Sequence, residues 1–374
     1  MSKNGNGGFY SNNQASVTEN SVLAKEKRGF PVKRTVFILL IALVVISLIL
    51  LVINLVINSY FKKVTVFDGA WEVDMDKVNS KPIYQDNKAF FMKNEEYHEA
   101  YDQALLNYAQ ANSDMRTDEN VFNYAVYGID QFGDSDNASA DIIMLVSVNK
   151  IDDHVTFLAF ETRMLVYIPT VGVGTLSDAY WLGGPQFLTN TIEQNYGLHI
   201  DGFIDLDMTA FVELIDEFGT IEFSANKEFL TKLNEDIASF NESKKLTGED
   251  AVPKAVLKKD KVYLTGMQTL AYLRKAGAQK SSVANSILKQ LITMAISHGF
   301  GGVKTTLDIA LDEMTVSLSR NDVGALITIG LSVLRSIETV PVGNMEGRAE
   351  IKGVGITCDY EAERAAVISA IYLD

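Results

Sequence analysis

Two aspartates, Asp130 and Asp141, stand where apolar segments of the chain end and begin. The first segment covers 123–129 and runs into Asp130, and Asp141 opens the second, which covers 142–148. Short apolar runs bounded by turn residues are typical of buried strands. If the two strands are neighbours, the carboxylates approach closely, and a divalent cation such as Mg²⁺, completed by phosphate oxygens and water, removes their repulsion. Without a metal, the same aspartates could cap a turn and a strand end.

The elements that follow place a helix beside this corner. A third strand is predicted to pass through 157–160 and to end at 167–169. Gly183, Gly184 and Pro185 then open a helix that ends at Gly197, and proline near the start with glycine after the end is a favoured arrangement. Two acids at strand ends beside the start of a helix can hold a cation and a phosphate.

The rest of the chain alternates strand-like and helix-like segments. Met208, Phe211, Val212 and Ile215 have the spacing of an amphipathic helix, which is expected to end near Gly219. Strands alternating with helices predict an α/β fold in which a central mixed sheet is sandwiched between helices. Other helices are predicted over 94–111, 225–241, 266–275, 282–298, 322–335 and 361–372.

The N-terminal part of the chain carries a candidate membrane span. From Val36 to Ile57 the chain is apolar except for one serine and one asparagine, and about 20 such residues cross a bilayer. Five basic residues lie shortly before this segment, whereas only Lys62 and Lys63 lie shortly after it. The excess predicts a cytoplasmic N-terminus, with the remainder of the chain outside the cytoplasm.

The composition narrows the classes of partner and site. The net charge is −15, although the first 34 residues hold six Lys/Arg against two Glu. An acidic body argues against nucleic acid as a partner, because phosphate binding needs a basic face. Cys358 is the only cysteine, which excludes an internal disulfide and a cysteine-cluster metal site, and it is expected to be a small buried residue.

Several short motifs follow one another in a fixed order from residue 123 towards the C-terminus. They are Gly-x-Asp at 128–130, the aspartate that opens the next strand, Val-Tyr-Ile-Pro at 166–169, Ala-Tyr-x-x-Gly-Gly-Pro at 179–185, Leu-Thr-Gly at 264–266 and Ala-Tyr-Leu-Arg at 271–274. This order resembles the LytR-CpsA-Psr (LCP) family of bacterial cell-envelope proteins. The resemblance implies an LCP-type domain that transfers glycopolymers from a polyprenyl-pyrophosphate carrier to peptidoglycan. It also implies that Asp130 and Asp141 bind Mg²⁺ beside the lipid pyrophosphate.

The resemblance further implies arginines that grip the pyrophosphate, and most of them are missing here. Phe132 stands where the family's Gly-x-Asp-x-Arg has its arginine. The family's Arg-Asp pair falls on Thr162 and Arg163, so the arginine is one position late. Of the family's Arg-x-Arg, Arg274 is kept and Ala276 replaces the second arginine. One catalytic arginine can be worth about 10³–10⁵ in rate, so little of the usual activity is expected.

A last arginine motif leaves two alignments open. The family's Arg-x-x-Arg-Gln falls on Ala284 and 287–288, or a shifted alignment places Lys289 and Gln290 on its Arg-Gln. The candidate site residues are therefore Asp130 and Asp141 for the metal, Arg274 and Arg163 for catalysis, and Lys289 and Gln290 for substrate binding.

The predicted organisation has four parts. They are a disordered cytoplasmic tail (1–34), a transmembrane helix (35–59), a membrane-proximal accessory segment (60–115) and an extracytoplasmic LCP-like domain (116–374). The expected function is binding of polyprenyl-pyrophosphate-linked glycopolymer for transfer to peptidoglycan, with reduced or no catalysis, which leaves open whether the chain is an enzyme. The alternative is a non-catalytic scaffold or a regulatory partner of active envelope enzymes. The expected partners are the membrane, the lipid-linked glycopolymer, peptidoglycan and an active paralogue, without nucleic acid.

Overall fold

The computed structural model describes residues 58–59, 62–67, 69, 71–129, 138–152, 154–275, 280–312, 314–318, 337–342 and 347–373. The predicted span at 36–57, the predicted helix at 322–335 and Asp130 lie outside these residues. Contacts divide the chain into two units, Met1–Asn54 and Leu55–Asp374, and the described fold belongs to the second. Of the helices that are described, none is both long and apolar enough to cross a membrane.

A mixed sheet forms the centre of the fold, as predicted. Its seven described strands lie in the order β1-β10-β7-β2-β3-β4-β11. Strand β2 pairs antiparallel with β3 and parallel with β7, and β4 pairs antiparallel with β3 and parallel with β11. The bounds are β1 Thr65–Val66, β2 Val121–Ile129, β3 Ala140–Asn149, β4 His154–Phe160, β7 Gly202–Asp207, β10 Met314–Val316 and β11 Ile337–Val342.

Three two-stranded ribbons stand apart from this sheet. They pair β5 (Leu165–Ile168) with β6 (Gly172–Thr175), β8 (Ile221–Ser224) with β9 (Lys261–Leu264), and β12 (Ala349–Ile351) with β13 (Gly355–Thr357). The sequence predicted one strand from 157 to 169. That prediction was wrong, because the chain leaves the sheet after Phe160 and β5 pairs with β6 instead.

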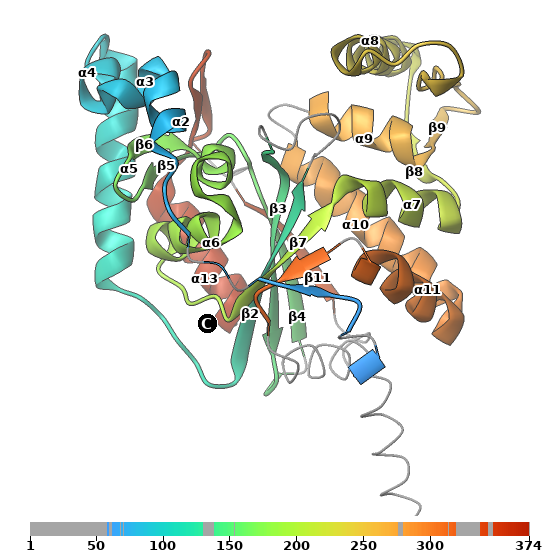
Figure 1. Cartoon of the computed structure of the whole chain (residues 1–374), viewed down its shortest axis with the longest axis horizontal. Coiled ribbons are helices and arrows are strands. Elements are labelled where there is room, and N and C mark those ends of the chain that lie inside the picture. The colour runs from blue at the N-terminus through green and yellow to red at the C-terminus, as the bar shows by residue number, and fades with distance from the viewer. Residues whose placement is uncertain are drawn as a thin grey trace, which may run out of the picture. The chain divides into compact units, whose positions relative to one another are not determined.

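Helices cover both faces of the sheet and make a three-layer sandwich (Figure 1). One face carries α6 (Leu176–Tyr196) and α13 (Tyr360–Tyr372), with α5 (Glu95–Ser113) packed against α6. The other face carries α7 (Met208–Phe218) and α10 (Lys280–Ser297), next to which lie α9 (Gly266–Lys275) and α11 (Gly299–Asp312). Helix α8 (Lys227–Lys244) packs on α9. The short helices are α2 (Met75–Ser80), α3 (Pro82–Gln85), α4 (Asn87–Phe91) and the 3₁₀ turn η2 (Gly248–Asp250).

Each face of the sheet has its own hydrophobic core. Tyr127 and Phe203 are fully buried towards α6, whereas Ile215 and Leu270 are fully buried in the core beneath α7 and α9. Strand β3 contributes to both cores, with Ile143 on one side and Met144 on the other. This explains its nearly continuous apolar sequence, since a strand covered on both faces needs no polar side.

The amphipathic helices were predicted closely, and the departures have local causes. Helix α7 ends at Gly219, and α9 has the predicted bounds. Helix α6 begins at Leu176 rather than at Pro185, and Gly184 at φ 73° kinks it. The predicted helix is the part after this kink, which starts at Pro185 and ends at the left-handed cap Gly197. The sequence did not predict α11, whose first turn holds three glycines, and glycine disfavours helix.

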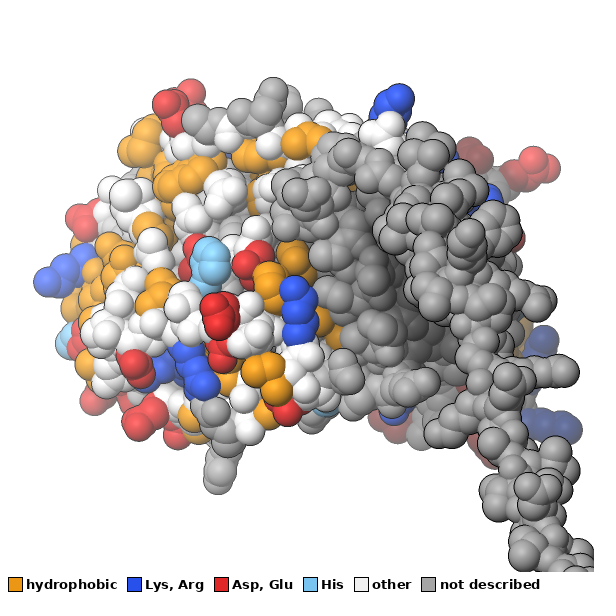
Figure 2. All heavy atoms as spheres, turned by 90° about the horizontal axis from the view of Figure 1, so that it is seen from below, with side chains coloured by type: hydrophobic (Ala, Val, Ile, Leu, Met, Phe, Trp, Pro, Cys, Tyr) orange, Lys and Arg blue, Asp and Glu red, His pale blue; other side chains and the backbone are white. Residues whose placement is uncertain are grey.

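The described surface seen in Figure 2 carries a mixture of acidic, basic and apolar side chains.

Trp71 belongs to the predicted accessory segment. It keeps about a third of its surface exposed and packs on Phe187 at 4.9 Å between ring centroids. The accessory segment is therefore in contact with α6, and the α5–α6 packing extends this contact along the helix.

Candidate functional site

An irregularity in the sheet positions Asp141. Gly128 pairs with Ile142 and Ile129 pairs with Ala140, so the register shifts and Asp141 has no opposite residue on β2. A bulge of this kind bends the strand and re-aims the extra side chain. The side chain of Asp141 keeps 13% of its surface exposed, at the start of β3 next to the C-terminal end of β2.

Arg274, a candidate catalytic arginine, lies against the carboxylate of Asp141. Its Nη1 atom is 3.5 Å from Oδ2 of Asp141, and its side chain is 25% exposed. Arg274 occupies the last turn of α9, where a cation is favoured by the helix dipole. Burial lowers the pKa of its guanidinium from the ordinary value. The structure therefore unites two of the predicted site residues in one partly desolvated pair.

Helix α8 closes the same corner, which the sequence did not reveal. The ring of Phe240 has its centroid 5.9 Å from the guanidinium carbon of Arg274. Lys244 follows one turn later and is half-buried. Burial lowers the pKa of Lys244, and the charge of Asp141 acts in the opposite direction. No local motif pointed to Lys244, because its approach to Asp141 depends on how the β8–β9 ribbon carries α8.

An apolar cavity is lined by residues that neighbour the charged pair in the chain. Its volume is about 170 Å³, and its lining is almost wholly apolar. Ile142 and Leu273 line it, and they are the chain neighbours of Asp141 and Arg274. The wall is completed by residues of β2, β3, β7, α7 and α10: Val126, Tyr127, Gly128, Met144, Leu206, Met208, Phe211, Leu214, Ala284, Ile287, Leu288 and Leu291.

Arg163 belongs to a different set of charges. Its Nη1 lies 2.9 Å from Oε1 of Glu350 on β12. Beside it, the buried Glu161 receives a hydrogen bond of 3.0 Å from Nη2 of Arg348, whose side chain is 16% exposed. Two ion pairs thus tie the end of β4 to the β12–β13 ribbon. The structure gives Arg163 a carboxylate partner of its own, and the sequence analysis did not single out the Glu161–Arg348 pair.

The two residues of the shifted alignment lie elsewhere on α10. Lys289 is exposed, and the amide of Gln290 bonds the backbone of β8, accepting from the Glu222 N–H at 2.9 Å and donating to its carbonyl at 3.0 Å. Ala284, on the ungapped alignment, lines the apolar cavity. The amide of Gln290 therefore anchors α10 to a strand.

A second carboxylate, that of Asp205 on β7, is bonded by the tyrosine of the Ala-Tyr-x-x-Gly-Gly-Pro motif. The hydroxyl of Tyr180 donates to Oδ2 of Asp205 at 2.7 Å. Burial raises the pKa of Asp205 to about 6, the hydrogen bond from Tyr180 opposes this rise, and nearby Asp207 adds to it. Asp207 itself caps α7, accepting from the Thr209 N–H at 2.6 Å. These acids thus fix the start of α7 and the position of α6.

The corner fits Mg²⁺ only in part with the residues that are described. Asp141 offers hard oxygen atoms, and Asp130 lies outside the described residues. Within the described ranges, no group of three or more His, Cys, Asp or Glu side chains could hold a metal by itself. Mg²⁺ needs few protein ligands when phosphate oxygens complete its octahedron. The donor set therefore suits a cation that arrives with a phosphorylated ligand.

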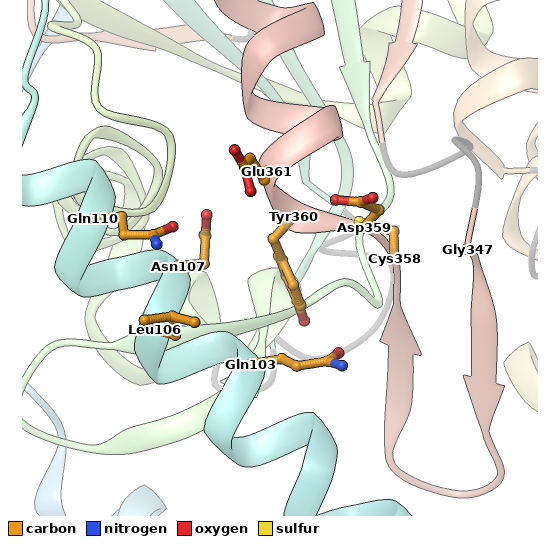
Figure 3. Close-up of a pocket in the computed structure, with 9 residues that line it drawn as sticks. All are labelled: Gln103, Leu106, Asn107, Gln110, Gly347, Cys358, Asp359, Tyr360 and Glu361. Atoms are coloured by element: carbon orange, nitrogen blue, oxygen red, sulfur yellow. The ribbon is translucent and has the colours of Figure 1, made fainter.

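A separate groove lies between α5 and the start of α13 (Figure 3). Its volume is about 380 Å³, and amide side chains of Gln103 and Asn107 face Tyr360 and Glu361 across it. Cys358 lies buried at its edge, where burial raises the pKa of the thiol to about 12. Of the predicted site residues that the structure describes, none lines this groove.

Comparisons with known proteins agree with the architecture. Residues 84–285 match the sequence profile of the LytR_cpsA_psr family. The polyisoprenyl-teichoic acid–peptidoglycan teichoic acid transferase TagU of Oceanobacillus iheyensis is 23% identical over 263 residues, which are 66% of this chain and 74% of TagU. The regulatory protein MsrR of Staphylococcus aureus strain COL is 28% identical over 108 residues, which are 29% of this chain and 32% of MsrR.

Solved structures share the fold at low sequence identity. A structure described as TagT bound to LI-WTA matches with a TM-score of 0.51 and 19% identity, and the match covers 69% of this chain and 94% of TagT. Protein gbs0355 of Streptococcus agalactiae matches with a TM-score of 0.53 and 16% identity over 67% of this chain and 88% of that protein. The family profile covers more than half of the chain and includes both Asp141 and Arg274, so the chain belongs to the LytR-CpsA-Psr family.

Proposed function

We propose that this chain binds a polyprenyl-pyrophosphate-linked glycopolymer of the bacterial cell envelope. The observation that carries the proposal is the apolar cavity, two of whose lining residues are chain neighbours of the Asp141–Arg274 pair. This combination matches a lipid whose hydrocarbon chain continues from a charged diphosphate. The name of TagU, a polyisoprenyl-teichoic acid–peptidoglycan teichoic acid transferase, supports the same class of ligand and makes peptidoglycan the acceptor.

The size of the cavity sets a condition on this function. Its volume of about 170 Å³ is below the roughly 300–1,000 Å³ of most ligand pockets. A long polyprenyl chain therefore requires α7 and α10 to move apart from the sheet. The lining makes such a movement inexpensive, since it replaces apolar contacts within the protein by apolar contacts with the lipid.

The charged corner would meet the pyrophosphate. Arg274 offers a guanidinium that can donate two hydrogen bonds to a phosphate. Asp141, together with Asp130, would hold Mg²⁺, which when bound supplies positive charge against the phosphate oxygens. Asp141 also orients Arg274, because the two charges lie 3.5 Å apart.

Catalysis by this corner is expected to be weak or absent. Transfer to a sugar hydroxyl with a polyprenyl phosphate as leaving group spreads charge over the phosphoryl oxygens, and preorganised cations must stabilise it. Phe132 and Ala276 bring no charge, and Arg163 is paired with Glu350. The pairing of Arg163 favours a second candidate, a non-catalytic scaffold or regulatory partner that presents the lipid-linked glycan to an active paralogue.

A membrane anchor at 35–59, with a cytoplasmic N-terminus, is part of the proposal. The apolar segment and the basic residues before it support this topology. The buried Cys358 is the only cysteine, so it gives little background in thiol labelling. In intact cells, Ser239→Cys should react with a membrane-impermeant thiol reagent and Ser16→Cys should not. The opposite pattern would overturn the orientation.

Mass spectrometry of co-purifying lipid tests the ligand directly. The full chain is extracted in mild detergent beside an Asp141→Ala variant, and lipids are released and identified. We expect polyprenyl-pyrophosphate species with the unaltered chain and much less with Asp141→Ala, because its metal ligand is lost. Recovery of bulk phospholipid alone, at equal levels from both proteins, would refute the proposed ligand.

A further inference from the structure

Helix α8 carries a basic residue to the same corner as Arg274. The contact between Phe240 and Arg274 fixes which side of α8 faces α9, with the ring centroid 5.9 Å from the guanidinium carbon. Lys244 lies four residues beyond Phe240, and residues at this spacing share one face of a helix. Lys244 therefore lies on the face of α8 that is turned towards Arg274.

The end of α8 keeps Lys244 in this position. The residue that caps the helix is Lys245, which adopts the left-handed conformation with φ 56°. Its N–H donates to the carbonyls of Asn241 and Glu242. Lys244 is thus the last helical residue and is held by a closed cap. A lysine that served only the helix dipole would extend into water, whereas Lys244 is half-buried.

The electrostatics agree with this geometry. Asp141 is the group whose charge opposes the effect of burial on the pKa of Lys244, so the ammonium and the carboxylate act on each other. Arg274 contacts the same carboxylate. Among the described residues of the corner, one carboxylate therefore interacts with two cations.

We propose that Lys244 is a second diphosphate-binding cation of this site, supplied from α8 where positions 132 and 276 bring no charge. This inference rests on the proposed function and assigns it a residue outside the family-like motifs. An ammonium on a flexible stem can reach a phosphate oxygen that the rigid fork of Arg274 does not cover. The acids of the corner offset part of this positive charge, which leaves a role for Mg²⁺ in binding the pyrophosphate.

The experiment measures binding of inorganic pyrophosphate to the full chain in detergent, by calorimetry, with Mg²⁺ present. Lys244→Met keeps most of the aliphatic stem and removes the charge, Lys244→Gln is a second neutral variant, and Lys244→Arg restores the charge. Lys232→Met is the matched control, because Lys232 lies on the same helix with 74% of its side chain exposed. Circular dichroism checks that each variant is folded.

We expect Lys244→Met and Lys244→Gln to bind pyrophosphate about tenfold more weakly, the effect of losing one charge-assisted contact. Lys244→Arg should bind within about threefold of the unaltered chain, and Lys232→Met should not differ from it. If the unaltered chain and both neutral variants bind with equal affinity, the role of Lys244 is overturned and the proposed function is not. The same holds if Lys232→Met loses as much affinity as Lys244→Met. Absence of binding by the unaltered chain would overturn the proposed function and this inference together.

Discussion

The guanidinium of Arg274 stands 3.5 Å from the carboxylate of Asp141, although one belongs to the last turn of α9 and the other to a bulge of β3. Both side chains are largely removed from water. Each lies next in the chain to a residue that lines the apolar cavity. The proposed ligand, an amphiphile with an anionic head, rests on this combination of a charged pair with neighbouring residues that line an apolar cavity.

The pair should contribute measurably to stability. We expect Arg274→Met to lower the free energy of unfolding by about 1–3 kcal/mol, because it leaves the carboxylate of Asp141 partly buried beside fewer donors. The double variant with Asp141→Asn should recover part of that loss. Urea unfolding followed by tryptophan fluorescence measures this through Trp71 and Trp181, the only two tryptophans. Additive losses in the double variant would show that the pair is not coupled.

Filling the cavity should exclude lipid without unfolding the protein. Ala284 lines the cavity and is 8% exposed, so Ala284→Phe places a ring where the lipid would lie. We expect co-purified polyprenyl lipid to fall about tenfold or more, with a stability change within about 3 kcal/mol. Ala238→Phe, at an exposed position of α8, is the control. Unchanged lipid in the Ala284 variant would place the ligand elsewhere.

Gly266 sets how closely α9 approaches α7. A Cβ atom there would lie 2.4 Å from the carbonyl oxygen of Val212. Because this oxygen belongs to the backbone of α7, it cannot easily move away. Gly266→Ala should therefore destabilise the fold by about 2–4 kcal/mol. Gly301→Ala, at a helical position with open space around it, should be neutral or stabilising by up to about 1 kcal/mol. Similar urea midpoints for the two variants would contradict the close contact.

Asp205 should make stability depend on pH. Its folded-state pKa of about 6 lies above the ordinary value of 3.8, so the folded chain binds the proton more tightly than the unfolded chain does. The contribution of Asp205 to stability is therefore largest below about pH 4, and it falls and is lost as the pH rises to about 6. Asp205→Asn should remove that fall and raise stability at neutral pH by about 1–3 kcal/mol. Asp250→Asn, at an exposed position, should keep the fall. An unchanged pH profile in Asp205→Asn would assign the effect to another group.

Local sequence patterns predicted the helices and strands that carry the site. Long-range packing determines which side chains come together in it. The spacing of Met208, Phe211 and Ile215 on one helix face fixed α7 and its core side. The Ala-Tyr-Leu-Arg motif singled out Arg274, and the structure puts its guanidinium 3.5 Å from the carboxylate of Asp141.

Other contacts could not be foreseen from spacing. Lys244 reaches the corner only because the β8–β9 ribbon folds α8 over α9, and Glu350 meets Arg163 only because the β12–β13 ribbon returns to the end of β4. Such contacts join segments that are far apart in the chain and carry no periodic signal. The role of Asp130 as a metal ligand stays a prediction, since the described residues do not include it.

The fate of a lipid-pyrophosphate donor on the full chain tests the central claim most directly. The chain is incubated in detergent with a polyprenyl-pyrophosphate-linked saccharide, an acceptor glycan and Mg²⁺, and mass spectrometry follows the intact donor and released polyprenyl phosphate, with Asp141→Ala as the control. We predict that the unaltered chain retains the donor intact, that Asp141→Ala retains much less, and that neither releases appreciable polyprenyl phosphate. Robust release by the unaltered chain that Asp141→Ala abolishes would contradict this account, because the corner would then be a competent catalytic site.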